Sequence, residues 1–392
     1  MKYDFESKIS RWHTGAAKWD FAPQHIKDGG YLPLTIADME FKTAPAITDA
    51  IKEAAEHGIF GYTYPDDEYF NALKGWMKER HDFDIEREWL LTTAGVVVAL
   101  GAIVREFTTE GDGVIIQPPV YPPFMSQVSG NNREIIENPL VYSDGRYTVD
   151  FEDLEKKCKA PNAKLLILCN PHNPVGRVWS RDELKRMGEI AKENGVIVLS
   201  NEIHGELILP GYRHTTFATI EGMADNCIIC TAMSKTFNLA GMCLSNILIP
   251  NAELKERLAK RLGREAAFGI PAISRYAAIA AFTKGGEWLD ELIMYVNGNF
   301  EYLYDFVEKR LPMLKCIKAE GTYLAWIDMR ALGLNNEQLE DLMLNKAFLQ
   351  LDEGYIFGES GSGFERINLA MPRYELQAAL ERMEKAIHEK CC

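Results

Sequence analysis

The sequence predicts an α/β fold in which a mostly parallel central sheet is flanked by helices, with a smaller α+β domain beside it. Apolar runs alternate with amphipathic helical segments over much of the chain, which is the order typical of βαβ units. These runs contain few alternating polar residues, as expected of strands that helices cover on both faces. With 392 residues, the chain is long enough to build two lobes.

The large lobe is expected to contain several buried strands and helices with recognisable ends. One helix has Ser180 at its N-cap, Glu183 in the position of a capping box and Gly195 just beyond its end. A second helix spans residues 43–57 and ends at Gly58. The expected strands are residues 113–117, 164–169, 196–200, 227–231 and 244–249.

After about residue 285 the pattern changes to long helices with few strands, which indicates a second, smaller lobe. Its expected helices are residues 288–311, 335–346 and 374–390, and its expected strands are 323–329 and 366–370. The N-terminal residues have weak periodicity, and we expect them to pack on this lobe. The expected domains are an N-terminal segment (1–45), a large domain (46–285) and a small C-terminal domain (286–392).

The composition narrows the class of function. A formal net charge of −14 argues against binding nucleic acid through a broad basic surface. No apolar run approaches the ~18 residues that a membrane span needs, and the acidic N-terminus has no apolar signal region. These features favour a cytoplasmic enzyme that acts on a small molecule.

The cysteines do not indicate a disulfide framework or a metal site. Cys227 and Cys230 form a C-x-x-C in an apolar, strand-like run, whereas redox motifs of this spacing usually open a helix. No second C-x-x-C completes a zinc site, so we expect two buried structural thiols and no metal. The sequence assigns no role to Cys391 and Cys392.

Polar side chains follow four of the predicted strands where each strand ends: Tyr121, Asn173, the pair Asn201 and His204, and Lys235. Because parallel strands end at one edge of a sheet, we expect these groups to share a crevice. Taken alone, a lysine at a strand end is more often a surface residue. A partly desolvated lysine with a lowered pKa can instead form a Schiff base with a carbonyl compound. The convergence of the other groups favours this second interpretation of Lys235.

The segments N-P-H-N-P-V-G (170–176), S-N-E-I-H (200–204) and S-K-T-F-N (234–238) carry a resemblance to a known family. In order and separation they resemble fold-type-I pyridoxal-phosphate (PLP) enzymes of the aminotransferase class I/II superfamily. Within that superfamily the chain is similar to the cystathionine β-lyase (C–S lyase, MalY/PatB) branch. Further matching stretches are I-A-D-M-E-F (36–41), H-G-I-F-G-Y (57–62), P-P-V-Y-P-P-F (118–124), G-T-Y-L-A-W (321–326) and G-F-E-R-I-N-L-A (363–370).

The resemblance implies roles around the cofactor ring. Lys235 would hold PLP covalently and move the substrate Cα proton, and Tyr121 would stack on the pyridine ring. Asn173 would donate to the phenolic oxygen, and His204 would lie near the same oxygen. Each has a plainer alternative: Tyr121 as a packing residue in a Pro-rich loop, Asn173 as a turn residue before proline, and His204 as a structural histidine.

The resemblance also implies a phosphate site shared between two subunits. The amides of Gly95 and Val96 at the start of a helix would cradle the phosphate, and Ser234 would add a hydroxyl. Tyr62 would reach the phosphate across the interface of a homodimer; its alternative is an ordinary core aromatic. Tyr62 and Tyr121 are also the candidates for the acid that protonates the leaving group.

The substrate α-carboxylate would bind Arg366, whose planar fork suits a bidentate contact. The backbone of Ala37 would lie near the same carboxylate. A surface ion pair is the alternative role of Arg366.

Asn201 departs from the family pattern, which usually has aspartate at this position. The aspartate keeps the pyridine nitrogen protonated by its charge, and asparagine has none. A weaker electron sink hurts transamination more than elimination, in which a leaving group carries electrons away. Three interpretations stay open: an engineered change, a natural variant with a less basic ring nitrogen, or an impaired enzyme with another role.

The expected activity is that of a PLP-dependent C–S β-lyase. It would convert cystathionine or a related L-cysteine S-conjugate to a thiol, pyruvate and ammonia. The alternatives are a PLP-dependent aminotransferase, or a weakly active PLP-binding regulatory protein. The sequence does not identify the preferred thiol.

Overall fold

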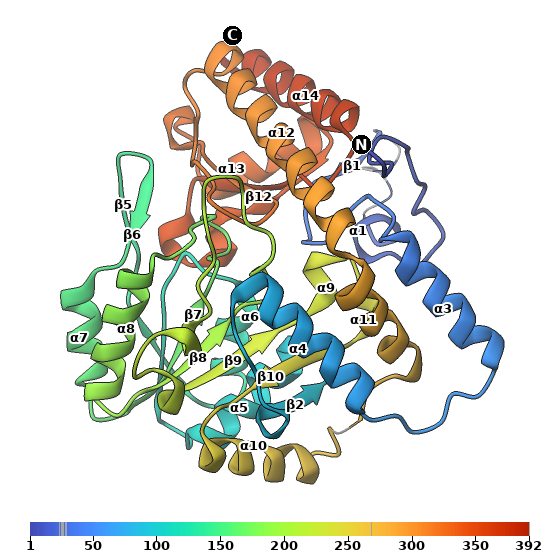
Figure 1. Cartoon of the computed structure of the whole chain (residues 1–392). Coiled ribbons are helices and arrows are strands. Elements are labelled where there is room, and N and C mark those ends of the chain that lie inside the picture. Colours follow the sequence, from blue (N-terminus) through green and yellow to red (C-terminus); the bar gives the residue numbers. More distant parts are fainter. Residues whose placement is uncertain (23, 25–26, 28–29, 268, 392) are drawn as a thin grey trace.

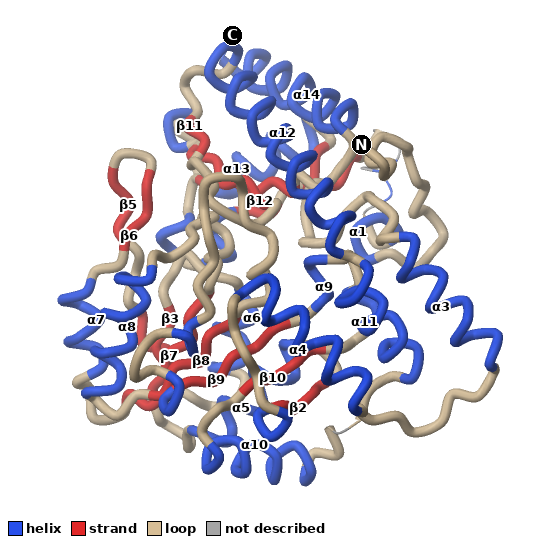
Figure 2. Tube along the Cα trace, viewed as in Figure 1, coloured by secondary structure: helices blue, strands red, loops and turns tan. Residues whose placement is uncertain are grey.

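The computed structural model describes residues 1–22, 24, 27, 30–267 and 269–391, and a seven-stranded sheet lies at the centre of its large lobe (Figures 1 and 2). In this sheet β10 runs antiparallel to both of its neighbours, and the other neighbouring pairs are parallel. In spatial order the strands are β2 (Leu90–Thr93), β10 (Ser245–Leu248), β9 (Cys227–Thr231), β8 (Ile197–Asn201), β7 (Ala163–Cys169), β3 (Gly113–Ile116) and β4 (Glu134–Glu137).

Successive residues of these strands point into two separate apolar cores. On β3, Ile115 belongs to one core, whereas Val114 and Ile116 belong to the other. Burial on both faces is the physical reason why the strand sequences do not alternate. The predicted α/β class and the five predicted strands are confirmed, each to within one or two residues.

Helices cover both faces of this sheet (Figure 1). The core that contains Val114 is completed by α5 (Val96–Phe107), α6 (Pro122–Ser129) and α10 (Ala252–Arg264). The core that contains Ile115 is completed on the other side by α4 (Asp67–His81), α7 (Phe151–Cys158), α8 (Arg181–Glu193) and α11 (Ala272–Lys284).

Two helices have the ends that the sequence predicts. On α8 the Ser180 hydroxyl accepts from the Glu183 amide, and the Glu183 carboxylate accepts from the Ser180 amide. The helix stops at Asn194, one residue before Gly195, whose φ is 70°. Helix α3 (Pro45–His57) ends at Gly58 in the left-handed conformation, which glycine adopts without steric cost.

Strands β2 and β4 were not predicted. β4 reads Glu-Ile-Ile-Glu and lies at the edge of the sheet, where its glutamates are exposed. β2 is the opposite edge, and its four residues Leu-Leu-Thr-Thr are too short and too polar at one end to form a clear apolar run.

The small lobe contains a four-stranded sheet with long helices beside it (Figure 1). Its strands, in spatial order, are β11 (Lys315–Cys316), β12 (Leu324–Asp328), β15 (Phe364–Asn368) and β14 (Asp352–Glu353). The helices beside it include α12 (Gly286–Arg310) and α14 (Arg373–Cys391). The helix predicted at 335–346 is α13 (Asn336–Asp341) followed by one π-helical turn, η6 (Leu342–Lys346).

The N-terminal residues contact the small lobe. β1 (Leu32–Pro33) pairs in parallel with β13 (Leu349–Gln350), and the Tyr295 hydroxyl donates to Glu6 at 2.8 Å. We propose domain boundaries near residues 45 and 285 on the basis of these contacts and the two sheets. Among the described residues, no helix is both long and apolar enough to cross a membrane.

Candidate active site

The strand directions bring most of the predicted site residues to one edge of the large sheet. Strands β2, β9, β8, β7 and β3 run in the same direction, so their carboxyl ends share that edge. Gly95, Lys235, Asn201, Asn173 and Tyr121 each end or follow one of these strands. Sequence order alone places them as much as 140 residues apart.

Lys235 lies in α9 (Met233–Thr236), a four-residue helix that directly follows β9. Its Nζ donates to the backbone oxygen of Ala37 at 2.7 Å. Burial, with the positive charge of Arg366, lowers the pKa of the Lys235 amine to about 8. About half of the amine is therefore neutral at pH 8 and able to act as a nucleophile or base.

Arg366 enters the site from β15 of the small lobe. Its Nη1 donates to Asn173 Oδ1 at 2.9 Å, and its Nε donates to Asp352 Oδ2 at 3.1 Å. Arg366 and Asp352 are cross-strand partners on β15 and β14, and both are largely buried. Arg366 does form an ion pair, but the pair is buried, so the alternative of a surface ion pair is wrong.

Asp352 is a site residue that was not predicted from the sequence. It lies in a two-residue strand that no periodicity marks, and only its pairing with Arg366 reveals it. Thr35 also donates to its other oxygen at 2.6 Å.

Asn201 and His204 contribute buried polar atoms that lack a protein partner. Within the described part of the chain, nothing pairs with Asn201 Oδ1 or His204 Nδ1. Burial, and then the nearby charges of Lys235 and Arg366, lower the pKa of His204 to about 3, so its imidazole is neutral at physiological pH. A buried polar atom without a partner is costly, and a bound ligand that supplies one would remove that cost.

The strand neighbours of Asn201 supply no carboxylate on its face of the sheet. Its neighbours in register are Cys169 on β7 and Cys230 on β9. Burial raises the pKa of both thiols, that of Cys169 to about 12, so both are neutral. Glu202 points away and accepts from Ser200, His214 and the Phe217 amide at 2.8–3.0 Å. It therefore does not replace the missing aspartate.

Gly95 is the N-cap of α5 and has an unusual backbone conformation. Its φ of 104° and ψ of 157° lie in a region that is essentially restricted to glycine. Val96 then begins a 12-residue helix whose first amides have no intrahelical acceptor. Ser234 is half-buried and immediately precedes Lys235.

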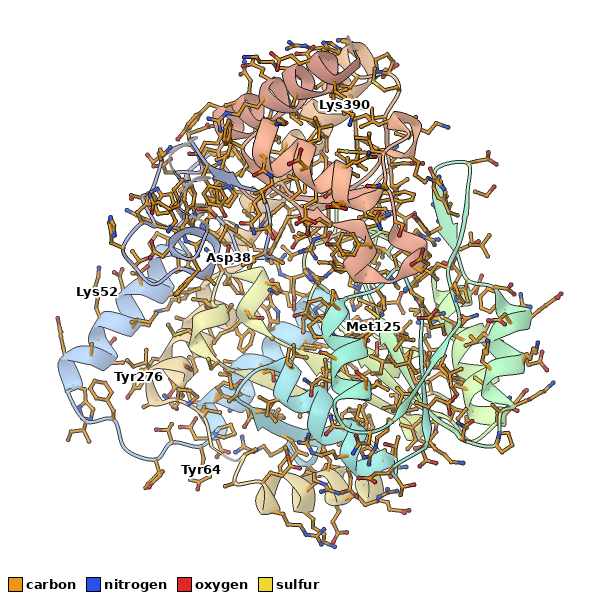
Figure 3. The ribbon with its side chains drawn as sticks, turned by 180° about the vertical axis from the view of Figure 1, so that it is seen from behind. Asp38, Lys52, Tyr64, Met125, Tyr276 and Lys390 are labelled. Atoms are coloured by element: carbon orange, nitrogen blue, oxygen red, sulfur yellow. The ribbon has the colours of Figure 1, made fainter. Side chains whose placement is uncertain are left out.

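Tyr121 and Tyr62 lie in contrasting positions. Tyr121 is the half-buried N-cap of α6; burial raises its pKa, and Arg366 is close enough to oppose that effect. Tyr62 is fully exposed on the long loop between α3 and α4, the loop that carries Tyr64 in Figure 3. Tyr62 is not a core aromatic. It borders a cavity of about 740 Å³ that Ala94, the neighbour of Gly95, also lines.

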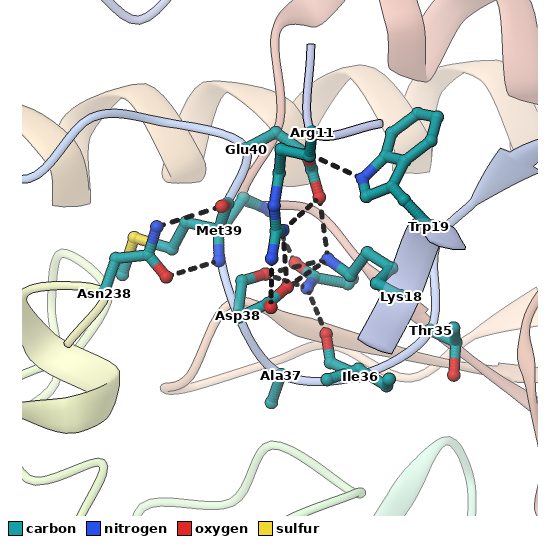
Figure 4. Close-up of polar contacts among 12 residues, drawn as sticks. Arg11, Lys18, Trp19, Thr35, Ile36, Ala37, Asp38, Met39, Glu40 and Asn238 are labelled. Carbon is teal, nitrogen blue, oxygen red and sulfur yellow. Dashed lines mark hydrogen bonds and ion pairs between the residues drawn. The ribbon is translucent and has the colours of Figure 1, made fainter. Parts of the chain in front are cut away.

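The segment that contains Ala37 is fixed by charged and amide side chains (Figure 4). Lys18 is almost fully buried and its Nζ pairs with Asp38 at 2.7 Å and Glu40 at 2.9 Å. Arg11 pairs with the same two carboxylates at 2.7 and 3.1 Å. The Asn238 side chain accepts from the Met39 amide and donates to its carbonyl oxygen, both at 3.0 Å.

Tyr323 is a second residue that sequence reasoning did not assign. It is fully buried, its hydroxyl donates to Ala37 at 2.8 Å, and its ring meets that of His204 edge-on at 6.1 Å. Its position inside G-T-Y-L-A-W was the only signal in the sequence.

The C-x-x-C cysteines lie on a buried strand. Cys227 and Cys230 are free and fully buried on β9. The described residues contain no group of three or more His, Cys, Asp or Glu side chains suited to a metal ion. Cys391 ends α14, and Cys392 lies outside the described residues.

The sequence matches known proteins over nearly its whole length. Residues 30–383 match the family model of aminotransferase class I and II. The chain is 43% identical to the cystathionine β-lyase PatB of Bacillus subtilis, over 98% of this chain and 100% of that protein. It is 30% identical to the protein MalY of Escherichia coli, over 98% and 99% of the two chains.

Solved structures agree with this similarity. Cystalysin from Treponema denticola, which contains a pyridoxal 5'-phosphate cofactor, superposes with a TM-score of 0.94 at 45% identity, and the match covers 100% of both chains. The PLP-bound C–S lyase from Staphylococcus hominis superposes with a TM-score of 0.92 at 33% identity, over 99% of this chain and 98% of that one.

Proposed function

The chain belongs to the aminotransferase class I and II family, and from this premise we propose that it is a PLP-dependent C–S β-lyase. Its substrate is cystathionine or a related L-cysteine S-conjugate, and its products are a thiol, pyruvate and ammonia. The 43% identity to a cystathionine β-lyase over 98% of the chain is the observation that carries the choice of reaction.

The residues present fit PLP. The site offers an amine with a lowered pKa, two buried polar atoms that need a partner, and a helix N-terminus preceded by a glycine-only conformation. When bound, PLP supplies an electron sink for the charge that develops at the substrate Cα. The residues that would hold it are Lys235, Tyr121, Asn173, Asn201, His204, Gly95, Val96 and Ser234.

Arg366 binds the substrate α-carboxylate. Asp352 and Asn173 fix its guanidinium from two sides, so little side-chain freedom is lost on binding. Because Arg366 comes from the small lobe and Lys235 from the large lobe, a substrate that contacts both lies between the lobes. Ala37 provides backbone beside it.

Lys235 removes the Cα proton. A pKa of about 8 leaves much of its amine neutral near physiological pH, so it can accept a proton. His204 is neutral in the same pH range and does not add a competing positive charge. Ala37 is buried and Lys235 is half-buried, so their contact is partly shielded from water.

We also propose that the protein is a cytoplasmic homodimer. Six cysteines, from Cys158 to Cys316, are free thiols, as is usual in a reducing compartment. The exposed loop around Tyr62 suits a contact with a second subunit, where Tyr62 would reach the phosphate of the partner's site and serve, with Tyr121, as a candidate acid for the leaving thiolate.

An assay with cystathionine tests the function. We expect pyruvate to form when PLP and cystathionine are present and no keto acid is added. Lys235→Ala should form none, and borohydride should tether PLP to the wild-type chain but not to this variant. Product formation that requires 2-oxoglutarate would instead support the alternative aminotransferase. A tethered cofactor without turnover of either kind would support a regulatory protein.

A further inference from the structure

Two β-branched residues adopt the left-handed backbone conformation beside the candidate site. Ile36 has φ = 49° and Thr322 has φ = 69°. This region is a genuine outlier for β-branched residues, because the branched side chain clashes with the backbone. Such strain persists only where surrounding contacts enforce it, and it gathers at functional sites. Here the two strained residues immediately precede Ala37 and Tyr323.

Surrounding hydrogen bonds hold both strained residues in place. The Asn368 side chain donates to the backbone oxygens of Ile36 at 2.8 Å and Asp38 at 2.6 Å. The Thr322 amide donates to Leu207 at 2.6 Å. Ala37 is therefore fixed from the small lobe as well as by the ion pairs of Figure 4.

The two strained segments meet at a single oxygen atom. The carbonyl oxygen of Ala37 accepts from Lys235 Nζ at 2.7 Å and from the Tyr323 hydroxyl at 2.8 Å. The amine and the phenol are thus neighbours that share one acceptor.

We propose that Tyr323 is a positioning residue for Lys235. Its hydroxyl donates to the Ala37 carbonyl oxygen, which also accepts from the free Lys235 amine, and so fixes that oxygen and weakens it as an acceptor. The strained backbone at Ile36 and Thr322 holds the Ala37 and Tyr323 segments in place. The inference rests on the proposed role of Lys235. A carbonyl oxygen that already accepts from a phenol is a weaker acceptor for a second donor. It therefore stabilises the ammonium form of Lys235 less than an unshared carbonyl would.

Several charged or titratable groups from other elements also act on Lys235, and a change at Tyr323 leaves them in place. Arg366 on β15 and Lys18 on α1 (Ala17–Asp20) favour the neutral amine, whereas Asp38 and Asp352 favour the ammonium. His204 is close enough to respond to the charge of Lys235.

Tyr323→Phe tests the proposal because it removes the hydroxyl and keeps the buried ring. With Ala37 left to Lys235 alone, we expect the pKa of the amine to rise by about one unit. The neutral fraction at pH 8 would then fall about fivefold. Tyr147→Phe is the matched control: Tyr147 is equally buried, and its hydroxyl accepts from Trp326 at 3.1 Å.

Two measurements on the full-length chain provide the readout. The first is the pH dependence of Lys235 acetylation by acetic anhydride in PLP-free protein, followed by peptide mass spectrometry. The second is the pH dependence of the rate at which added PLP is captured, followed by absorbance. We expect both midpoints to move to higher pH in Tyr323→Phe and to stay at the wild-type value in Tyr147→Phe.

The outcomes separate this inference from the proposed function. Identical acetylation midpoints in all three proteins would overturn the role of Tyr323, even if PLP is captured normally. A shifted acetylation midpoint in a protein that captures no PLP would support the positioning role and contradict the proposed cofactor.

Discussion

At the scale of single residues, Asn201 has the clearest consequences for stability and chemistry. It ends β8 between the neutral thiols Cys169 and Cys230, and its Oδ1 has no partner in the described structure. The carboxyl group of Glu202, the next residue, forms its hydrogen bonds on the opposite face. The ring nitrogen of a bound PLP would therefore face the neutral Asn201 side chain and no carboxylate at this position. This favours elimination, in which the leaving group takes electrons, over transamination, which needs a long-lived carbanion.

We predict that Asn201→Asp destabilises the PLP-free protein by about 1–3 kcal/mol, because it buries a carboxylate among neutral groups. Burial raises the pKa of that carboxyl, so the folded state binds its proton more tightly than the unfolded state does. The loss of stability should thus be small at pH 5 and grow as the pH rises. PLP should restore stability, because its ring nitrogen can hold a proton beside the new charge.

Thermal unfolding with and without PLP at pH 5 and 8 checks this prediction, and wild-type protein under the same conditions is the control. An equal loss of Tm in all four conditions would show that the new carboxylate does not face the cofactor.

At the scale of elements, α5 requires glycine at its start because of the backbone conformation there, and not because space for a side chain is lacking. An added Cβ at Gly95 meets nothing within 4 Å, yet φ there is +104°. Gly75, inside α4, has the same free space with an ordinary helical backbone. Alanine substitutions at Gly95 and Gly75 therefore differ in backbone strain and not in steric clash.

We expect Gly95→Ala to cost about 1–3 kcal/mol of stability from strain and to weaken PLP binding, because the first amides of α5 shift. Gly75→Ala should instead stabilise by about 0.5–1 kcal/mol. Urea unfolding and PLP titration measure both effects. If the two variants behave alike, the special conformation of Gly95 is unimportant.

The pairing of β14 with β15 makes the stability of the small lobe sensitive to pH. Asp352 pairs with Arg366 on one face, whereas Glu353 lies opposite Glu365 on the other. Burial, with neighbouring carboxylates, raises the pKa of Glu353 to about 7 and that of the fully buried Glu365 as well. Two carboxylates in direct opposition are stable only while protons neutralise them.

The raised pKa values fix the sign of the effect: this pair stabilises the fold at low pH, and the contribution is lost as the pH rises through about 7. We expect Glu365→Gln, which stays neutral, to lose roughly 1–3 kcal/mol less stability than wild type between pH 6 and 9. Urea denaturation across this range measures the difference. Parallel pH profiles for the two proteins would contradict it.

At the scale of the whole molecule, each protomer is proposed to complete the other's site. Tyr62 is fully exposed, and its loop borders the cavity beside Ala94. Light scattering should give a mass of twice the 44.3 kDa chain.

Mixing two inactive variants tests the shared site. Tyr62→Ala and Lys235→Ala should each have little activity alone. After unfolding and refolding together, half of the dimers would be mixed, and each mixed dimer would contain one intact site. About a quarter of the wild-type activity should therefore return. No recovery, despite dimers of normal mass, would place Tyr62 outside the partner's site.

The fold class, the five inner strands and the ends of α3 and α8 were predictable from the amino-acid sequence. These features follow from local rules: apolar runs buried on both faces, a capping box, and glycine at a left-handed position. The order of polar residues after the strands was predictable as well. β2 and β4 were not, because edge strands are short and polar, and neither was the π turn that ends α13.

The contacts between groups that lie far apart in the sequence follow from the packing of the folded chain. Asp352 is paired with Arg366 by strand register. Tyr323 and Lys235 both donate to Ala37, which lies 286 residues before Tyr323 in the sequence. Such contacts depend on how the lobes pack, and no local pattern encodes that packing. The same holds for the neutral surroundings of Asn201, which three adjacent strands create together.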